Sequence, residues 1–237
     1  MEERSLLFHI GPVWFDGTIL LMTVIVCTII FALIYSFSRN LKMKPKGKQN
    51  MLEWVIDFVR GIVSGQLPQS EVRNYDFFAF GLFLFVFVAN EIGLVTKLVN
   101  NDTTYWKSPT ADPVVTMGLA FMVMLLANFW GVKKMGVKEY FVNGFLNPVA
   151  VILPIKLMEE FTNIISMGLR LYGNIYAGEV LLGLIISIVN GLGWLALPFA
   201  MLLEMTWIGF SLFIGAIQAY VFVTLAMVFL SHKIVKE

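Results

Sequence analysis

The apolar stretches of this sequence are too long for a soluble fold. The first runs from Gly17 to Ser38, 22 residues without one charged side chain. As an α-helix it would be about 33 Å long, which matches a bilayer core of about 30 Å. Hydrophobic residues make up 58% of the chain and charged residues only 14%, whereas soluble domains carry about 25% charged residues. The sequence therefore predicts an all-α, polytopic membrane protein that forms a single membrane domain over residues 1–237.

Five transmembrane helices are predicted in this domain. The residues before the first one lack the positive start of a signal peptide, so we expect this span to be retained in the protein. The last two are nearly twice as long as a bilayer requires, so they either project into water or are strongly tilted. Their apolar residues continue almost throughout, which favours a strong tilt. The predicted spans cover about residues 17–38, 76–97, 113–132, 154–189 and 194–231.

A sixth helix is predicted over about residues 50–66, between the first two spans. Its apolar residues are interrupted by Glu53, Asp57 and Arg60, which share one helix face. It is too charged to cross a bilayer, so we expect an amphipathic helix that lies on the membrane interface.

The basic residues gather in short loops and predict the orientation of the chain. Five follow the first predicted span, and three more follow the third. Because basic loops stay on the cytoplasmic side, the N-terminus is predicted outside and the C-terminus inside, in a multi-pass protein of the cell membrane. The net charge is only +1, which gives no case for nucleic-acid binding. The basic residues are Arg39, Lys42, Lys44, Lys46, Lys48, Lys133, Lys134 and Lys138.

Arg170 is an isolated charge inside the fourth predicted span. Nine uncharged residues separate it from Glu160 and eight separate it from Glu179. An arginine at the centre of a membrane helix costs about 2.5–3.5 kcal/mol on insertion scales, and its guanidinium stays protonated. It therefore needs water or an anionic partner. A structural ion pair with Glu91 or Glu204 is one interpretation, and a functional site is the other.

Other polar residues of the last two spans lie at helical spacings. Asn174 follows Arg170 by four residues and shares its face, whereas Glu179 lies about 180° around the helix and about 13.5 Å along it. A carboxylate at this depth is a plausible proton relay. On the last span Glu204, Ser211 and Gln218 recur every seven residues, with Thr224 beyond them. Such a stripe either joins helices or lines a water path.

No cofactor or metal site is predicted. The only histidines, His9 and His232, lie near the two ends, and the single Cys27 lies in an apolar run. These residues cannot form a haem or metal constellation, and we expect Cys27 to be a small core or lipid-facing residue. The sequence thus argues against a membrane enzyme.

The segment from Ser166 to Glu179, SMGLRLYGNIYAGE, closely resembles the signature of subunit a of F-type (bacterial) ATP synthases, approximately S-x-x-L-R-L-[FY]-G-N-x-x-A-G. Residues 217–222, IQAYVF, provide a second match. The size of the chain, the five spans and the two long final helices also fit this family.

The resemblance implies a proton-channel subunit of the rotary motor that couples hydrogen ion transport to ATP synthesis in the CF(0) sector, with no enzymatic activity of its own. Two offset half-channels would deliver protons to and from the carboxylate of the rotating c-ring. Besides the c-ring, peripheral-stalk b subunits, the lipid bilayer and the translocated protons would be its partners. The alternative is a stand-alone ion-coupled transporter that uses Arg170 and Glu179.

The resemblance also implies roles for single residues. Arg170 would face the c-ring carboxylate and prevent a short circuit, with Asn174 beside it and Gln218 opposite it. Glu179 would belong to the outer half-channel, together with Ser211, which stands where some members carry a histidine. Glu159 and Glu160 would belong to the inner half-channel.

Overall fold

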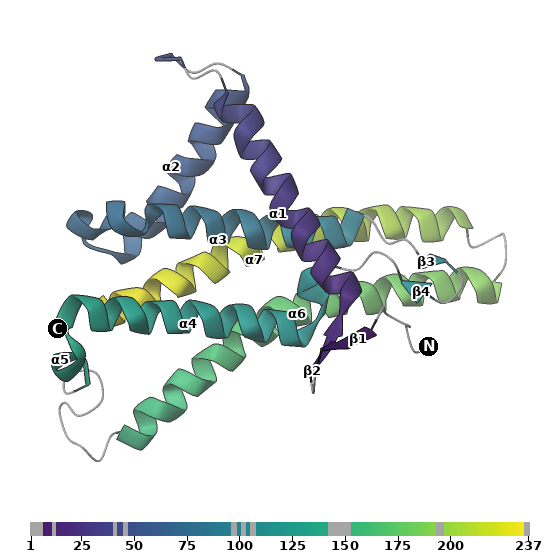
Figure 1. Ribbon diagram of the computed structural model, residues 1–237. Coiled ribbons are helices and arrows are strands. Elements are labelled where there is room, and N and C mark those ends of the chain that lie inside the picture. The colour runs from purple at the N-terminus through teal and green to yellow at the C-terminus, as the bar shows by residue number, and fades with distance from the viewer. Residues whose placement is uncertain are drawn as a thin grey trace. The chain divides into compact units, whose positions relative to one another are not determined.

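The computed structural model consists mainly of long α-helices (Figure 1). It describes residues 7–10, 13–39, 42–44, 47–95, 99–100, 103–104, 108–141, 153–192 and 197–234. The helices are α1 (Gly17–Ser38), α2 (Lys48–Gln66), α3 (Gln69–Val95), α4 (Pro113–Met135), α5 (Val137–Phe141), α6 (Leu153–Leu192) and α7 (Leu197–Ile234).

Short extended segments connect some of these helices. Strand β1 (Leu7–Ile10) pairs antiparallel with β2 (Val13–Asp16), and β3 (Val99–Asn100) pairs with β4 (Thr103–Thr104). The 3-10 turn η1 (Pro109–Ala111) precedes α4. These pairs have at most four residues in a strand, so the all-α fold class predicted from the sequence is confirmed.

Four helices of the described part of the chain are long and apolar enough to cross a membrane, namely α1, α3 as far as Gly93, α4 and α7. The fourth predicted span, 154–189, corresponds to α6, and its passage through the membrane stays a prediction. Helices α6 and α7 have 40 and 38 residues, so both are as long as the sequence predicts. Their tilt also stays a prediction.

The helix bounds follow the predicted ranges at most ends. Helix α1 has the predicted bounds, and α2 begins two residues before the predicted start at 50. The fourth span is predicted to end at about residue 189, whereas α6 continues to Leu192. Helix α5 has five residues and is not predicted from the sequence.

Helix α3 begins at Gln69, seven residues before the predicted start of the second span. Its first turns carry charges that a bilayer core would exclude, and two of them, Glu71 and Asp76, are paired. Lys134 of α4 donates to Glu71 at 2.6 Å, and Arg60 of α2 donates to Asp76 at 2.8 Å. The helix therefore extends beyond its apolar part, because ion pairs stabilise the polar turns at its start.

Residue contacts divide the chain into two units, which we describe separately. The first unit comprises Met1–Arg39, Leu84–Asp112 and Leu171–Ala219, and the second comprises Asn40–Phe83, Pro113–Arg170 and Tyr220–Glu237. Helices α3, α6 and α7 contribute residues to both units. The single membrane domain stays a prediction.

In the first unit, α1 packs against the second half of α3. Val26 is fully buried and lies against Val88 and Ala89, with Ile29 and Phe85 around them. Asp16 precedes α1, and its side chain accepts a hydrogen bond from the Thr18 amide at 2.9 Å. This carboxylate satisfies one of the free amides at the start of the helix, which fixes where α1 begins.

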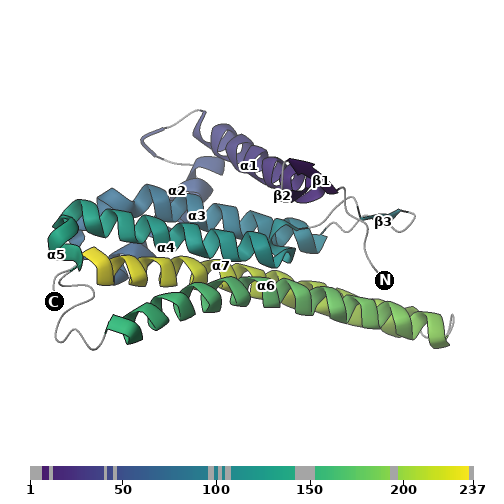
Figure 2. The ribbon, with the colours of Figure 1, turned by 60° about the horizontal axis from the view of Figure 1, so that its bottom comes forward.

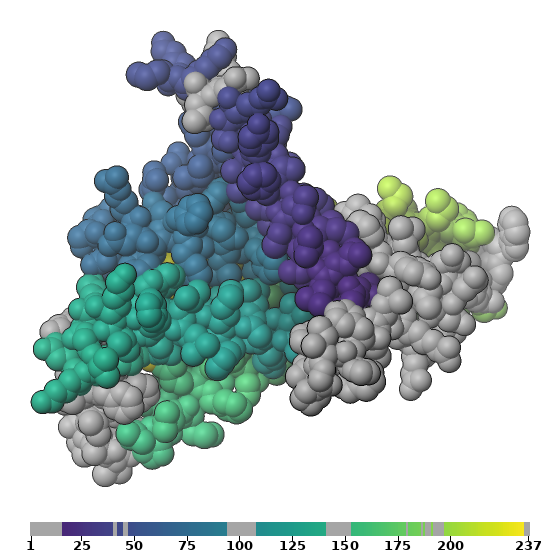
Figure 3. Space-filling model, in the orientation of Figure 1, coloured from purple at the N-terminus to yellow at the C-terminus, as the bar shows by residue number. Residues whose placement is uncertain are grey.

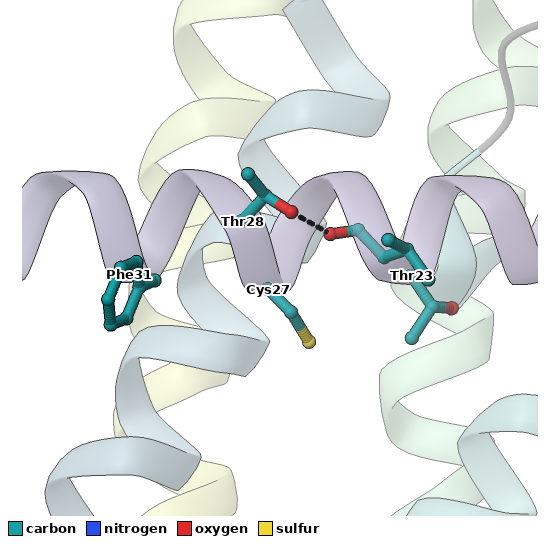
Figure 4. Close-up of a pocket in the computed structure, with 5 residues that line it drawn as sticks. Thr23, Cys27, Thr28 and Phe31 are labelled. Carbon is teal, nitrogen blue, oxygen red and sulfur yellow. Dashed lines mark hydrogen bonds between the residues drawn. The ribbon is translucent and has the colours of Figure 1, made fainter.

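Helix α1 is the purple element that runs across the face drawn in Figure 3. The remaining surface of α1 exposes large apolar side chains, among them Leu21, Val24 and Phe31. A hollow on this surface is lined by Thr23, Val24, Cys27, Thr28 and Phe31, all from α1 (Figure 4). Thr28 is engaged by its own helix, since its hydroxyl donates to the Val24 carbonyl at 2.7 Å. Cys27 is exposed, as expected of a lipid-facing residue.

In the second unit, aromatic contacts join the helices. Trp130 of α4 makes edge contacts with Tyr75 and Phe78 of α3, at ring-centroid distances of 5.1 and 4.9 Å. Phe58 of α2 lies near Phe83 of α3 and near Tyr220 of α7. The charged helix α2 is thus joined by one aromatic residue to two helices of its unit.

Helix α4 ends at a glycine that lets the chain turn into α5. Gly136 has a φ of +81°, a left-handed conformation that glycine adopts without strain. Its amide donates to the Val132 carbonyl at 2.8 Å, and its carbonyl accepts from the Tyr140 amide at 3.0 Å. Figures 1 and 2 both show the C-terminal end of α7 near α5.

Candidate functional site

Arg170 lies within α6 and is exposed. The residues around it, such as Met167, Leu169 and Leu171, are good helix formers, and no proline follows Pro154 in this helix. Among the side chains that the structure describes, none forms an ion pair with Arg170. The second unit therefore presents a fixed positive charge that has no described counter-ion.

Glu159 and Glu160, also in the second unit, have different surroundings. Glu159 is exposed, whereas Glu160 is partly buried and pairs with Lys233 of α7, whose ammonium donates to Oε1 of the carboxylate. Lys233 also lies over the ring of Tyr140 in α5, with its ammonium 5.8 Å from the ring centroid. Lys233 of α7 thus contacts both α5 and α6, and its partner on α6 is a carboxylate that the family resemblance assigns to the inner half-channel.

Tyr140 continues this group of side chains toward α4. Its hydroxyl donates to Oδ1 of Asn128, and burial raises the pKa of the phenol. A Cβ on Gly131 would stand only 2.7 Å from the Tyr140 ring and 3.0 Å from the Lys233 carbonyl oxygen. Gly131 therefore lets α4 approach both residues closely. None of these contacts is predicted from the sequence.

In the first unit, Asn174 is half-buried on α6. Glu179 belongs to the same helix, but its side chain lies outside the described part of the structure. Ser211 and Gln218 of α7 are both buried at 7% exposure. Nε2 of Gln218 has no hydrogen-bond partner within the described residues. The structure thus buries two polar side chains on one face of α7.

Thr224, which the sequence places beyond this stripe, lies in the second unit. Its hydroxyl donates to the Tyr220 carbonyl of its own helix at 2.8 Å. This is the usual local bond of a threonine within a helix. A bond within one helix shows neither a contact between helices nor a water path, so both interpretations of Thr224 stay predictions. Glu204 is exposed on α7.

A buried polar cluster in the first unit is not predicted from the sequence. Asn90 of α3 is fully buried, and its Oδ1 accepts from the Thr110 hydroxyl at 2.9 Å. The Ser108 hydroxyl donates to the Ala89 carbonyl at 2.7 Å and lies 2.7 Å from the Thr110 hydroxyl. Two polar residues together in an apolar span, Asn90 and Glu91, are the signal that could have revealed it.

Glu91 lies at the edge of this cluster. Asn90 reaches α7, where its Nδ2 donates to the Gly215 carbonyl at 3.5 Å, the long end of the hydrogen-bond range. Oε1 of Glu91 also faces Gly215. In the first unit, the side chains of Asn90 and Glu91 therefore both face α7 at Gly215.

The predicted site residues divide between the units. Arg170, Glu159 and Glu160 belong to the second unit, while Asn174, Glu179, Ser211 and Gln218 belong to the first.

Within the described residues no group of three His, Cys, Asp or Glu could hold a metal ion. Proton transfer and electrostatic attraction are the chemistry that these carboxyl, amide, hydroxyl and guanidinium groups can perform.

Long apolar helices with buried polar side chains and a mid-helix arginine define a polytopic transmembrane protein. Comparisons with known proteins then give its family. The model of the ATP synthase A chain family matches residues 20–231. The chain belongs to this family, which makes it a transmembrane protein of ATP synthesis and ion transport.

Individual relatives agree over the full length. The chain is 64% identical to ATP synthase subunit a of Enterococcus hirae and 57% identical to that of Enterococcus faecalis, in both cases over 238 residues and 100% of both chains. It is 46% identical to ATP synthase subunit a of Pediococcus pentosaceus over 223 residues, which are 94% of each chain. The resemblance seen in the sequence around Arg170 is therefore confirmed.

Proposed function

We propose that this chain is the stator subunit that conducts protons to and from the c-ring in the membrane sector of an ATP synthase. One observation carries the proposal. Arg170 is an exposed arginine in the middle of a long helix, and it has no ion pair with a described side chain. A permanent cation in a membrane segment needs water or an anionic partner, and in this proposal the c-ring carboxylate is that partner.

Two half-channels, offset from each other, lead to the c-ring on either side of Arg170. Protons enter from outside past Glu179 and Ser211 and neutralise a ring carboxylate. They leave on the cytoplasmic side past Glu159 and Glu160. Asn174 and Gln218 help to position the guanidinium.

The electrostatics explain why rotation is coupled to proton flow. A protonated ring carboxyl can move into lipid, which an ionised one can do only at great cost. After nearly a full turn it releases its proton, and Arg170 attracts the resulting carboxylate. Each proton that crosses contributes about 2.3 kcal/mol per 100 mV of membrane potential. The guanidinium also repels protons that would pass directly between the half-channels. The chain itself makes no covalent bond.

The partners and the orientation follow from this role. The c-ring, the b subunits of the peripheral stalk, the bilayer and the translocated protons are the partners of the chain. The basic residues after α1 and α4 support a cytoplasmic position of those loops. In this proposal the N-terminus lies on the outer side of the cell membrane and the C-terminus on the cytoplasmic side.

Replacement of Arg170 tests the proposal directly. In the complete ATP synthase reconstituted into vesicles, Arg170→Ala abolishes proton-driven ATP synthesis and ATP-driven proton pumping. Arg73→Ala is the matched control, because Arg73 is also an exposed arginine but lies in the first turns of α3. Pumping at the control rate by the Arg170→Ala complex would contradict the proposal.

A second experiment separates this function from that of a stand-alone transporter. The purified chain alone should show no ion transport in vesicles, and in mild detergent it should co-purify with the c-ring. Transport by the chain alone would favour the transporter. Within the complex, Glu179→Gln should slow proton flux, and an unchanged flux would remove Glu179 from the path.

A further inference from the structure

Glu91 is a buried carboxyl group that the proposed mechanism does not use. Both of its carboxylate oxygens are shielded from solvent, and neither has a hydrogen-bond partner within the described residues. It lies on α3, one of the helices that are apolar enough to cross a membrane. An ionisable side chain within a membrane span is costly and usually functional. The position of Glu91 therefore calls for a role.

The surface that faces Glu91 is the polar stripe of α7. A Cβ on Gly215 would stand 2.8 Å from Oε1 of Glu91 and 3.6 Å from Cβ of Asn90. Gly215 follows Ser211 by four residues and precedes Gln218 by three, so these three residues share one helix face. All three are buried. Oε1 of Glu91 thus faces α7 at Gly215, between Ser211 and Gln218 of the polar stripe.

The distances along α7 suit a chain of proton carriers. Ser211 and Gln218 are seven residues apart, which is about 10 Å along the helix. This distance is too long for one hydrogen bond but can be bridged by a carboxyl group and one or two waters. Gln218 also has its buried Nε2 without a partner in the described part of the chain. The glycine at 215 leaves room for the carboxyl group at the midpoint.

The neighbouring cluster keeps the backbone of Glu91 in place. Asn90 is held by Thr110 at 2.9 Å, and the carbonyl of Ala89 is held by Ser108 at 2.7 Å. Ala89 and Asn90 immediately precede Glu91 on α3. A proton carrier needs such a rigid support, because the rate of transfer depends on short and constant distances.

We propose that Glu91 is a further proton-carrying residue of the outer path, positioned between Ser211 and Gln218. The Glu91 carboxylate accepts a proton from a hydronium ion that enters from the outer side, which becomes water, and Glu91 becomes a neutral carboxylic acid. It then gives up this proton through water to the ionised carboxylate of the c-ring and returns to the carboxylate, so each passage leaves Glu91 unchanged. This inference rests on the proposed function as a proton-conducting subunit.

The test uses the complete ATP synthase in vesicles with three variants of this chain. Glu91→Gln keeps the size and polarity of the side chain but cannot carry a proton, and it should reduce proton flux at least about tenfold. Glu91→Asp keeps the carboxyl group and should recover a large part of that flux. Asp57→Asn is the control with normal flux, since Asp57 is an exposed carboxylate of α2. Subunit content and ATP hydrolysis with an uncoupler are measured in every sample.

Two results would overturn the inference. One is normal proton flux in the Glu91→Gln complex. The other is an equal loss in the glutamine and aspartate variants that parallels a loss of this subunit, which is the behaviour of a structural residue. If the Glu91→Gln complex does not assemble, the proton flux of the Gly215→Ala complex tests the inference instead. The added Cβ displaces only the flexible end of Glu91, so the complex should assemble with reduced flux, and normal flux there overturns the inference.

The Arg170→Ala complex distinguishes this inference from the function on which it rests. Normal pumping by Arg170→Ala contradicts the proposed function itself. Loss of pumping in Arg170→Ala together with normal flux in Glu91→Gln contradicts only the role of Glu91.

Discussion

Gly168 marks a close approach of two helices, two residues before Arg170. A Cβ on Gly168 would stand 2.7 Å from Sδ of Met117 in α4, 3.1 Å from its Cα and 3.3 Å from its amide nitrogen. The sulfur belongs to a flexible side chain and can move away. The two backbone atoms cannot, and favourable contacts with carbon lie at about 3.5–4.0 Å. Gly168→Ala therefore forces α6 and α4 apart in the second unit.

The cost follows from two opposing effects. Alanine in place of glycine favours a helix by about 0.5–1 kcal/mol. Insertion of an extra carbon into a tight contact costs about 1–3 kcal/mol. Gly118 of α4 offers a control, because a Cβ there would meet no atom within 4 Å. Since Gly118→Ala gains the helix preference without the clash, it should be more stable than Gly168→Ala by about 1–3 kcal/mol.

Unfolding of the purified chain in mixed micelles, followed by circular dichroism, measures this difference. Gly168→Ala should unfold at a lower denaturant fraction than Gly118→Ala. Adding Met117→Ala to Gly168→Ala should restore only part of the stability, because the backbone contacts remain. Equal stability of the two single variants would refute the close approach. Full recovery in the double variant would show that the sulfur alone is responsible.

Two further changes test contacts at the ends of helices. Asp16→Ala removes the side chain that accepts from the Thr18 amide, and should lower stability by about 0.5–2 kcal/mol in the same unfolding assay; no change would mean that the cap contributes nothing. Lys233→Met leaves the partly buried Glu160 without its cation and should destabilise the chain, whereas adding Glu160→Gln should recover stability. Additive effects of these two substitutions would contradict the pairing.

The helices could be predicted because their signals are local. The apolar run from Gly17 to Ser38 has no charge, and α1 has the same bounds. The start of α3 was missed, because Glu71 and Asp76 look incompatible with a span when their partners are unknown. Those partners, Lys134 and Arg60, are 63 and 16 residues away. A single sequence does not show which distant charges will meet, so it cannot show that a charged turn is stabilised.

The glycines of α6 make the same point at shorter range. Gly168, Gly173 and Gly183 look alike in the sequence, and simple packing is the natural interpretation of all three. Only Gly168 of these three has a close neighbour, whereas a Cβ on Gly173 or Gly183 would meet nothing within 4 Å. The sequence indicates where a close approach is possible, but the packed partner decides where it occurs.

The candidate site was predictable where one helix carries the pattern, as it does for Arg170 and for Ser211 and Gln218. It was not predictable for Glu91, whose role depends on facing Gly215, 124 residues away on α7. In the sequence Glu91 is a carboxylate near the end of a span, which suits an ion-pair partner for Arg170. In the structure its oxygens have no partner within the described residues.

Glu160 and Glu91 show why the surroundings of a carboxylate decide its use in proton transfer. Glu160 has a cation, Lys233, and a proton can bind there only if this ion pair is broken. Glu91 has no such pair among the described residues, and a bound proton removes the cost of a buried charge. Gly215→Ala should therefore lower proton flux by displacing the Glu91 carboxyl group, whereas Lys233→Met should act mainly by removing an ion pair and should lower the amount of assembled subunit. Proton flux in the Lys233→Met and Gly215→Ala complexes, compared in the same vesicles, separates these two kinds of carboxyl group.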